Sequence, residues 1–309
     1  MKPLEKSLEN PHSFQLLTSL TPHEFIILLQ TFDNLCVGYF RQHNLQGKKR
    51  SIPKYVEDSR CSLQGSTSKL LFLLEYLKEN PSQTYHGDKY GFSQGKVSQW
   101  VKCLLPLLEK ALVLMHFAPK RMGWLMVGTL EALVGQVIYV DATEREIPRS
   151  VCAARQESEY SGKAGYHTLK NTLITTQNKY IIYLGDTYEG AAHDKRMLDE
   201  AHIPFLEDIS VLLDLGYVGF DAPQAQVMLP CKKPPKGELN AEEKKINQYL
   251  AHLRVSVEHH IGSVKRLRIV SQKIRLRGDE NRDRVMYIAC ALHNFRTTQR
   301  QKHSNKKLS

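Results

Sequence analysis

The sequence predicts an α/β protein in two parts, an all-α region followed by a region built on one mixed sheet. Apolar residues recur at helical spacing between residues 21 and 116. From about residue 136 they form the short alternating or continuous runs that are typical of strands, and helical patterns return behind them. With 309 residues, 41% of them hydrophobic, the chain is long enough for about two domains with a sizeable core.

The first strong helix signal lies at Thr21. A capping hydroxyl, a proline in the first turn and an acidic residue near the positive end all favour a helix start there. Apolar residues then continue at helical spacing to about residue 43. We assign residues 1–65 to an N-terminal helical segment with a basic loop at residues 47–55, which is either a DNA-backbone contact or a solvated connector.

Residues 66–120 are predicted to hold three helices in the pattern of a helix-turn-helix domain. The second helix is short, at about residues 82–90, and Ser93 caps the third, whose inward face carries Val97, Trp100 and Val101. A generic amphipathic bundle helix also explains this pattern. If the third helix enters a DNA major groove, its outward side chains would contact bases and phosphates. These side chains are Gln94, Lys96, Ser98, Gln99 and Lys102.

The second part of the chain alternates between strand and helix signals. Residues 121–135 are expected to be a linker, residues 136–299 the mixed-sheet domain, and residues 300–309 a basic disordered tail. A tight turn at Asn178 predicts a hairpin between two of the strands. Strands are predicted at 136–140, 165–176, 180–184, 209–213 and 226–229, and helices at 191–202, 241–270 and 282–297.

Charge and composition narrow the class of protein. The net charge of +11 favours a polyanionic partner, whose binding would depend on salt. No pair of the six cysteines has the spacing of a zinc or redox motif, so free thiols in a reducing compartment are the simplest interpretation. The first residues lack the apolar core of a signal peptide, and no stretch reaches the roughly 18 apolar residues of a membrane span. We therefore expect a soluble, cytoplasmic protein that does not bind membranes and, if bacterial, is associated with the nucleoid.

Three acidic residues are the most informative feature of the chain. Asp141 and Asp214 each end an apolar run that reads as a buried strand, and Glu258 lies in a predicted helix. Aspartates at strand ends meet at one edge of a sheet, where a crevice can form. Carboxylates in such a cluster suit hard divalent cations, and two metal ions together assist phosphodiester displacement. Asp186, Asp194 and Asp199 compete with Asp214 for the role of second acid.

The predicted helix around Glu258 carries charged residues at regular spacing. Arg254, Glu258, Ile261 and Lys265 recur at intervals of four, three and four residues, which places them on one helix face. Such a face is either a solvated, salt-bridged surface or a site where the glutamate binds metal and the cations neutralise phosphate. Further basic residues could contact DNA. They are Arg266 and Arg268 beyond the helix, and Lys163 and His167 near the second strand, with Lys170 beside them.

Taken together, these segments resemble DDE-type transposases of bacterial insertion sequences, close to the IS5 and related groups, over roughly residues 66–300. The resemblance lies in the order and spacing of several short motifs. They are Tyr139-Val-Asp-Ala-Thr-Glu, Tyr160-Ser-Gly-Lys-Ala-Gly-Tyr-His-Thr-Leu-Lys-Asn, Gly190-Ala-Ala-His-Asp-Lys-Arg-Met-Leu, Leu213-Asp-Leu-Gly-Tyr-Val-Gly, Arg254-Val-Ser-Val-Glu-His-His-Ile-Gly-Ser-Val-Lys and His293-Asn-Phe-Arg.

The resemblance implies an RNase H-like catalytic domain whose metal-binding and catalytic acids are Asp141, Asp214 and Glu258. In that topology the second acid follows the fourth strand, which favours Asp214 over its competitors. The resemblance also implies Mg²⁺ or Mn²⁺ as cofactor, with two ions per site, and cleavage and strand transfer of double-stranded DNA at terminal inverted repeats. It implies a homo-oligomer on DNA.

Two other functions remain open from the sequence. One is a domesticated relative that binds DNA without cutting it, which metal-dependent nicking would distinguish. The other is an RNase H-like nuclease that acts on another nucleic acid, since one fold serves several nucleases.

Overall fold

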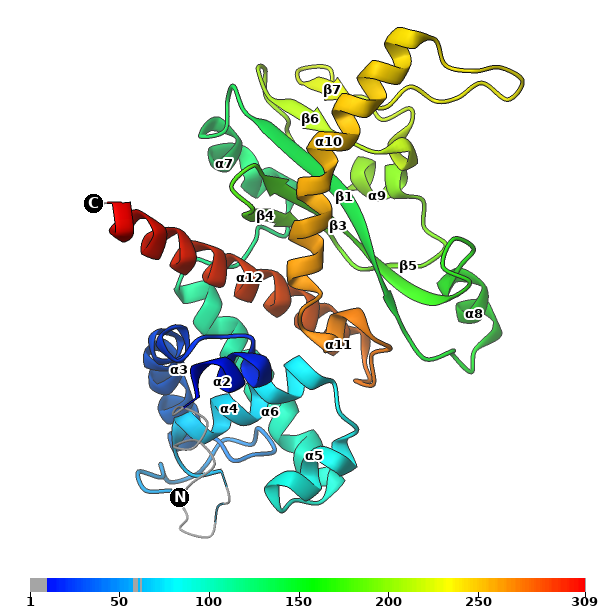
Figure 1. Cartoon of the computed structure of the whole chain (residues 1–309). Coiled ribbons are helices and arrows are strands. Elements are labelled where there is room, and N and C mark those ends of the chain that lie inside the picture. Colours follow the sequence, from blue (N-terminus) through cyan, green and yellow to red (C-terminus); the bar gives the residue numbers. More distant parts are fainter. Residues whose placement is uncertain (1–9, 58–60, 62, 309) are drawn as a thin grey trace. The chain divides into compact units, whose positions relative to one another are not determined.

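The structure is a computed structural model that describes residues 10–57, 61 and 63–308 (Figure 1). Contacts divide the chain into two units. We call Met1–Ala118 together with Lys265–Ser309 the helical unit, and Pro119–Val264 the sheet unit. The helix predicted at residues 282–297 therefore belongs to the same unit as the first helices, whereas the sequence analysis placed it in the mixed-sheet domain.

The helical unit begins with helices whose ends are fixed by local residues. Thr21 caps α3 with its hydroxyl and Glu24 closes the capping box, which confirms the helix start predicted there. Asn80 and Gly91 adopt left-handed conformations that end α4 and α5. The helices of this part are α2 (Pro11–Thr18), α3 (Pro22–Gln42), α4 (Gly65–Glu79), α5 (Gln83–Tyr90) and α6 (Gln94–Leu114).

The helix α6 carries the side chains that were predicted to face DNA. Ser93 caps it, and Val97, Trp100 and Val101 are buried, which confirms the predicted helix start and inward face. Gln94, Lys96 and Lys102 are exposed, and Ser98 and Gln99 are half-buried. Helix α6, which follows a short turn after α5, therefore presents a polar face to solvent.

The C-terminal helices differ from the prediction at two ends. The predicted helix 241–270 ends at Val264 in α10 (Ala241–Val264), and Lys265 and Arg266 lie in a turn before the short α11 (Arg268–Ser271). The Lys78 ammonium donates to the backbone carbonyl of Arg266 at 2.9 Å, which holds this turn within the helical unit. The last helix, α12 (Asp279–Leu308), continues through the tail expected to be disordered, because no glycine or proline follows Gly278 to stop it.

The sheet unit contains a mixed sheet in the order β2-β3-β1-β6-β7, with β4 and β5 also paired to β3. The β1–β3 and β3–β4 pairs are antiparallel, whereas β6 and β7 run parallel to β1. The five predicted strands and the hairpin at Asn178 are confirmed, and the two-residue strands β2 and β5 are additional. The strands are β1 (Val137–Glu146), β2 (Tyr160–Ser161), β3 (Tyr166–Thr176), β4 (Ile181–Leu184), β5 (Tyr188–Glu189), β6 (Ser210–Leu212) and β7 (Gln226–Met228).

Helices cover both faces of this sheet, and alternation along β1 separates two apolar layers. Ile138 and Val140 pack in a large cluster on one face, whereas Tyr139 packs in a smaller cluster with Leu250 and Val257 of α10 on the other (Figure 1). The remaining helical segments of the unit are η1 (Gly123–Met126), α7 (Val127–Glu131), α8 (Ala153–Glu159), α9 (Asp194–Glu200) and η2 (Leu215–Tyr217). Among the described residues, no helix is long and apolar enough to cross a membrane.

Candidate active site

Asp141 and Asp214 come from neighbouring parallel strands of the sheet unit. Tyr139 of β1 pairs with Leu212 of β6, and continuing this register by two residues places Asp141 beside Asp214. Because side chains alternate along a strand, both aspartates belong to the face that carries Tyr139 and Leu212, which is the face covered by α10. The strand pairing therefore brings the first two predicted acids to one place.

Arg254 of α10 joins the two aspartates. Its Nη2 atom lies 3.6 Å from Oδ2 of Asp214 and 3.9 Å from Oδ2 of Asp141. All three side chains are largely buried, with 24%, 21% and 18% of their surfaces exposed for Arg254, Asp214 and Asp141. The guanidinium thus partly compensates two carboxylates that burial has removed from bulk water.

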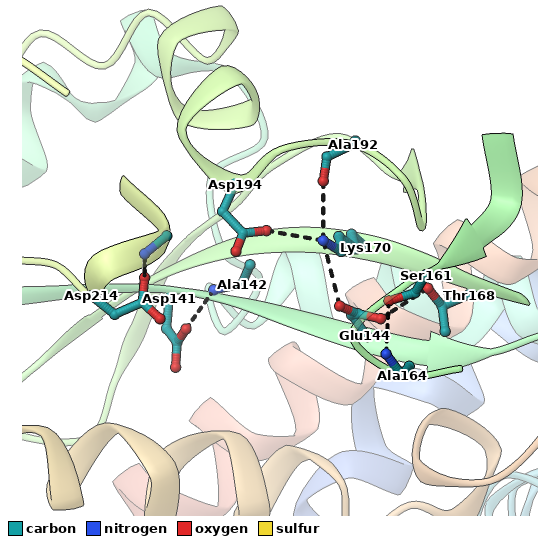
Figure 2. A network of polar contacts seen from close by, with 11 residues as sticks. Asp141, Ala142, Glu144, Ser161, Ala164, Thr168, Lys170, Ala192, Asp194 and Asp214 are labelled. Atoms are coloured by element: carbon teal, nitrogen blue, oxygen red, sulfur yellow. Dashed lines mark hydrogen bonds and ion pairs between the residues drawn. The ribbon is translucent and has the colours of Figure 1, made fainter. Parts of the chain in front are cut away.

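The other oxygen of each aspartate accepts a hydrogen bond from the backbone. The amide of Gly216 donates to Oδ1 of Asp214 at 2.8 Å, and the amide of Ala142 donates to Oδ1 of Asp141 at 2.8 Å (Figure 2). In Asp214 this bond caps η2, the short helical turn that follows β6. These bonds fix the direction of both carboxylates.

The electrostatics at Asp141 are unfavourable for its ionised form. Burial raises the pKa of Asp141 to about 6, Arg254 opposes that rise, and the negative charges of Asp214 and Asp194 add to it. A carboxyl group in this condition gains from any additional positive charge nearby. The site therefore favours a cation.

Asp194, at the start of α9, approaches Asp214, which the sequence interpretation preferred as the second acid. A Cβ atom at Gly216 would lie 2.9 Å from Oδ2 of Asp194 and 2.9 Å from Oδ1 of Asp214. The carboxylates of Asp194, at the start of α9, and of Asp214, after β6, therefore both lie close to Gly216. The other two competitors lie elsewhere: Asp186 is exposed and pairs with Arg121, and Asp199 pairs with its neighbour Lys195.

Lys170 is buried, although the sequence interpretation grouped it with basic residues that could contact DNA. Its ammonium donates to the carbonyl of Ala192 at 3.0 Å and lies 3.3 Å from Oδ1 of Asp194 and 3.4 Å from Oε1 of Glu144 (Figure 2). Glu144 also accepts a hydrogen bond from Thr168 at 3.0 Å. The cross-strand pairing of Glu144 with Lys170 was not readable from the sequence, because it depends on the register between β1 and β3.

Glu258 lies on α10, one turn after Arg254, and its side chain is exposed. No hydrogen bond or ion pair joins Glu258 to Asp141 or Asp214 in the described part of the chain. Over the same described residues, no three His, Cys, Asp or Glu side chains already converge as they would around a bound metal. The structure therefore brings together two of the three predicted acids, and the third lies on the helix that supplies their arginine.

The other predicted DNA contacts are spread over both units. Lys163 is exposed in the turn between β2 and β3, and His167 is half-buried with its ring 5.6 Å from that of Tyr160. In the helical unit, Arg266 is exposed in the turn before α11, where Lys265 also lies, and Arg268 pairs with Glu79. Arg268 is thus already engaged by an acid of its own unit.

The donor set at this site fits a hard divalent cation. Mg²⁺ and Mn²⁺ prefer carboxylate oxygens, and Asp141, within β1, and Asp214, just after β6, offer these side by side. Burial is the main cause of the raised pKa of Asp141, and the negative charges of Asp214 and Asp194 add to it, so an additional positive charge would stabilise the ionised form. We conclude that these residues suit such an ion on chemical grounds.

Comparisons with known proteins give a consistent result. The family profile described as DDE superfamily endonuclease matches residues 140–294, a range that includes Asp141, Asp194, Asp214 and Glu258. The chain is 31% identical over 210 residues to a protein of Microchaete diplosiphon named probable transposase for insertion sequence element IS702. That similarity covers 67% of this chain and 72% of the relative. No solved structure matches the chain.

Proposed function

The chain belongs to the DDE superfamily endonucleases, a family of transposases, and we propose that it cleaves and joins DNA at the ends of an insertion sequence. The observation that carries this proposal is the convergence of Asp141 and Asp214 on Arg254 within the region that matches the family. The net charge of +11 supports DNA as the partner.

The sheet topology supports an RNase H-like catalytic domain. Three antiparallel strands, β4, β3 and β1, are followed across the sheet by β6 and β7, which run parallel to β1. In this arrangement Asp141 lies on the central strand and Asp214 follows the adjacent strand, as the proposed catalytic pair requires.

Asp141 and Asp214 are the residues that would hold Mg²⁺ or Mn²⁺, and we propose Glu258 as the third acid, with two ions in the full site. Bound divalent ions activate the attacking oxygen and stabilise the leaving oxygen in phosphodiester displacement. The backbone amides of Ala142 and Gly216 orient the two aspartates in advance of ion binding. Arg254 compensates their charge before the ion arrives and is placed to meet a phosphate afterwards.

DNA recognition is assigned to α6 in the helical unit. Its exposed Gln94, Lys96 and Lys102 lie on the side opposite the buried Val97 and Trp100, as in a recognition helix. Paired element ends need paired active sites, so we propose that the protein acts as a homo-oligomer on DNA.

The test is cleavage of labelled duplex DNA that carries the flanking sequences of the gene, with Mg²⁺, Mn²⁺ or EDTA. The wild-type protein should cut at the element end only with metal, and Asp214→Ala should abolish cutting while DNA binding is kept. Asp199→Asn is the matched control, because Asp199 pairs with Lys195 in the same unit and should be dispensable. Tight binding without cutting under any metal condition would instead indicate a DNA-binding protein that has lost catalysis.

A further inference from the structure

The basic loop at residues 47–55, whose role the sequence left open, is folded against the end of α3. The backbone amides of Arg50 and Lys54 donate to the carbonyls of Gln42 at 2.7 Å and Arg41 at 2.9 Å. Nε of Arg50 also donates to two carbonyl groups at the end of the same helix. The loop therefore has fixed contacts within the helical unit.

A cavity of about 530 Å³ lies between this loop, α3, the start of α4 and the start of α6. Its volume is within the range of small-molecule sites, roughly 300–1,000 Å³. Every described residue that lines it belongs to the helical unit. Aromatic side chains line it from several of these elements. They are Phe40 of α3, Tyr55 at the end of the loop, Phe92 just before α6, and Trp100 of α6.

The aromatic lining is partly buried and partly open to solvent. Phe40 and Trp100 are in contact, with ring centroids 5.6 Å apart, and Nζ of Lys69 lies 5.6 and 5.7 Å from these two centroids. Trp100 is 4% exposed, whereas Tyr55 and the neighbouring Val56 are 74% and 77% exposed. Exposed apolar side chains grouped beside a cavity are typical of a ligand-binding groove.

The charged side chains of the lining give the cavity a positive balance. Among the described residues that line it, five are cationic and two are acidic, so the net charge is +3. They are Arg41, Arg50, Lys54, Lys69 and Lys96, with Asp33 and Glu57. Lys69 and Glu57 pair with each other, which leaves four cationic side chains against one acid. The cavity therefore favours an anionic ligand.

Aromatic rings and cationic side chains in one cavity favour a ligand that is both flat and anionic. Proteins hold unpaired nucleotides in this way, by stacking the bases on aromatic rings and placing cations at the phosphates. The guanidinium of Arg41 lies 4.7 Å from the centroid of the Tyr55 ring, so a cation and an aromatic ring stand together in the lining. Lys96 also belongs to the outward face of α6, so the cavity borders the surface proposed to contact DNA.

We propose that this cavity binds one nucleotide, with its base against the aromatic side chains and its phosphate at Arg41, Lys54 and Lys96. The base must be unpaired, because a base within a duplex is stacked and cannot enter a cavity. A strand end exposed by DNA cleavage would supply such a nucleotide, and this choice of source rests on the proposed function. A free nucleotide offers the same chemistry. The binding itself requires neither a metal ion nor the acidic residues of the sheet unit.

The first experiment follows the fluorescence of Trp100 in the full-length protein in EDTA. The chain has two tryptophans, so Trp124→Phe leaves Trp100 as the only one. A 5′-phosphorylated pentathymidylate should change its emission in a saturable manner, and an abasic pentamer with the same number of phosphates should bind at least about fivefold more weakly. Weaker binding of thymidine monophosphate than of the pentathymidylate supports a DNA strand as the ligand, and equal binding supports a free nucleotide at the same site. Equal affinity for the abasic and thymidylate pentamers, or no change of emission with either, would overturn the proposal.

Two pairs of variants locate the ligand in the cavity. Tyr55→Ala should weaken pentathymidylate binding at least about fivefold, whereas Tyr85→Ala should change it less than about twofold. Tyr85 is a matched control, because it is 68% exposed and is not among the described residues of the lining. Lys54→Gln should likewise weaken binding more than Lys48→Gln, which changes an exposed lysine of the same loop outside that lining.

Equal effects within each pair would mean that the oligonucleotide binds through the general charge of the unit, and the cavity would be excluded as its site. Cleavage of duplex DNA would be untouched by that result, so the proposed function would stand. If duplex DNA is not cleaved but the cavity variants behave as expected, the proposed function fails and the nucleotide site is kept.

Discussion

Nη2 of Arg254 lies 3.6 Å from Oδ2 of Asp214, so a helix on one face of the sheet supplies the countercharge for a strand end. The same nitrogen lies 3.9 Å from Oδ2 of Asp141. Without a metal ion, this arginine is the cation that contacts both aspartates. Arg254 and a divalent cation would therefore both compensate the negative charge of the two aspartates. Each should reduce the contribution of the other to the stability of the folded protein.

Arg254→Gln should destabilise the metal-free protein and increase its response to metal. Removing one partner of a buried ion pair leaves the other uncompensated, which costs about 3 kcal/mol for well-buried pairs and less here because the site is partly exposed. In calorimetric melts with EDTA, the variant should unfold at a lower temperature than wild type. Added Mn²⁺ should raise its Tm by more than it raises that of wild type. Equal metal responses in the two proteins would contradict this relationship.

Asp141→Asn should stabilise the metal-free protein at neutral pH. Because the pKa of Asp141 rises from 3.8 to about 6 in the folded state, folding is disfavoured once the carboxyl ionises. The penalty is absent below pH 3.8, grows as the pH rises towards 6, and is complete above it. A shift of this size corresponds to roughly 1–3 kcal/mol.

The measurement for this prediction is urea denaturation in EDTA at pH 4 and at pH 7.5. The advantage of Asp141→Asn over wild type should be present at the higher pH and largely lost at the lower one. Asp199→Asn serves as the control, since Asp199 is partly exposed and paired with Lys195. A variant that is less stable than wild type at pH 7.5 would show that Asp141 is better compensated than we infer.

Gly216→Ala should impair cleavage far more than it affects folding. The added methyl group would lie 2.9 Å from carboxylate oxygens of both Asp194 and Asp214, so both side chains must move. We expect cleavage to fall at least tenfold, with a change in unfolding free energy within about 1 kcal/mol. Gly128→Ala is the matched control in the sheet unit, because a Cβ atom there meets nothing within 4 Å. Full activity in Gly216→Ala would mean that the spacing of these carboxylates is unimportant.

Glu258→Gln should abolish metal-dependent cleavage while leaving DNA binding unchanged. The side chain is exposed on the helix that carries Arg254, so its loss should not disturb the core. Cleavage of labelled duplex and gel-shift affinity, measured on the same preparation, separate these effects. Glu242→Gln, at an exposed position near the start of α10, should retain cleavage. Activity of Glu258→Gln close to wild type would remove Glu258 from the proposed catalytic acids.

Lys96→Ala combined with Lys102→Ala should weaken DNA binding in a salt-dependent manner. Each lysine that contacts a phosphate contributes about 0.9 to the slope of log affinity against log salt. The double variant should therefore bind more weakly at low salt and show a slope smaller by about two. Lys110→Ala, which is exposed farther along α6, is the control. An unchanged slope would indicate that α6 does not contact the DNA backbone.

Local signals in the sequence predicted most of the secondary structure. Thr21 and Ser93 predict helix starts because their hydroxyls can accept hydrogen bonds from backbone amides, and the structure contains both caps. The end of α10 at Val264 could not be predicted in this way, because Lys78 and Glu79 of a distant helix hold the turn that follows. Periodicity reports local preference and carries no information about such partners.

In the candidate site, too, some residues could be predicted from local sequence signals and others could not. Asp141 and Asp214 could be proposed as neighbours, since each ends an apolar run in the sequence, and the register between β1 and β6 agrees with that expectation although β1 continues past Asp141 to Glu146. The sequence offered Asp194 only as one of three competitors of Asp214, because its approach to Asp214 depends on the path from β5 to α9 and on Gly216. Lys170 could not be recognised as buried, because its burial arises from contacts with Glu144 and Ala192 across the fold.

The division of the chain also affects the order in which the protein can be completed during synthesis. Helix α12 contacts α6, where Arg284 pairs with Glu109 at 2.6 Å, and Asn294 donates to the carbonyl of Phe117 at 2.9 Å. The partners in each pair are separated by the whole sheet unit in sequence. A ribosome must therefore translate the sheet unit before the first helices receive their last partners, and the α6 surface covered by α12 stays exposed until then.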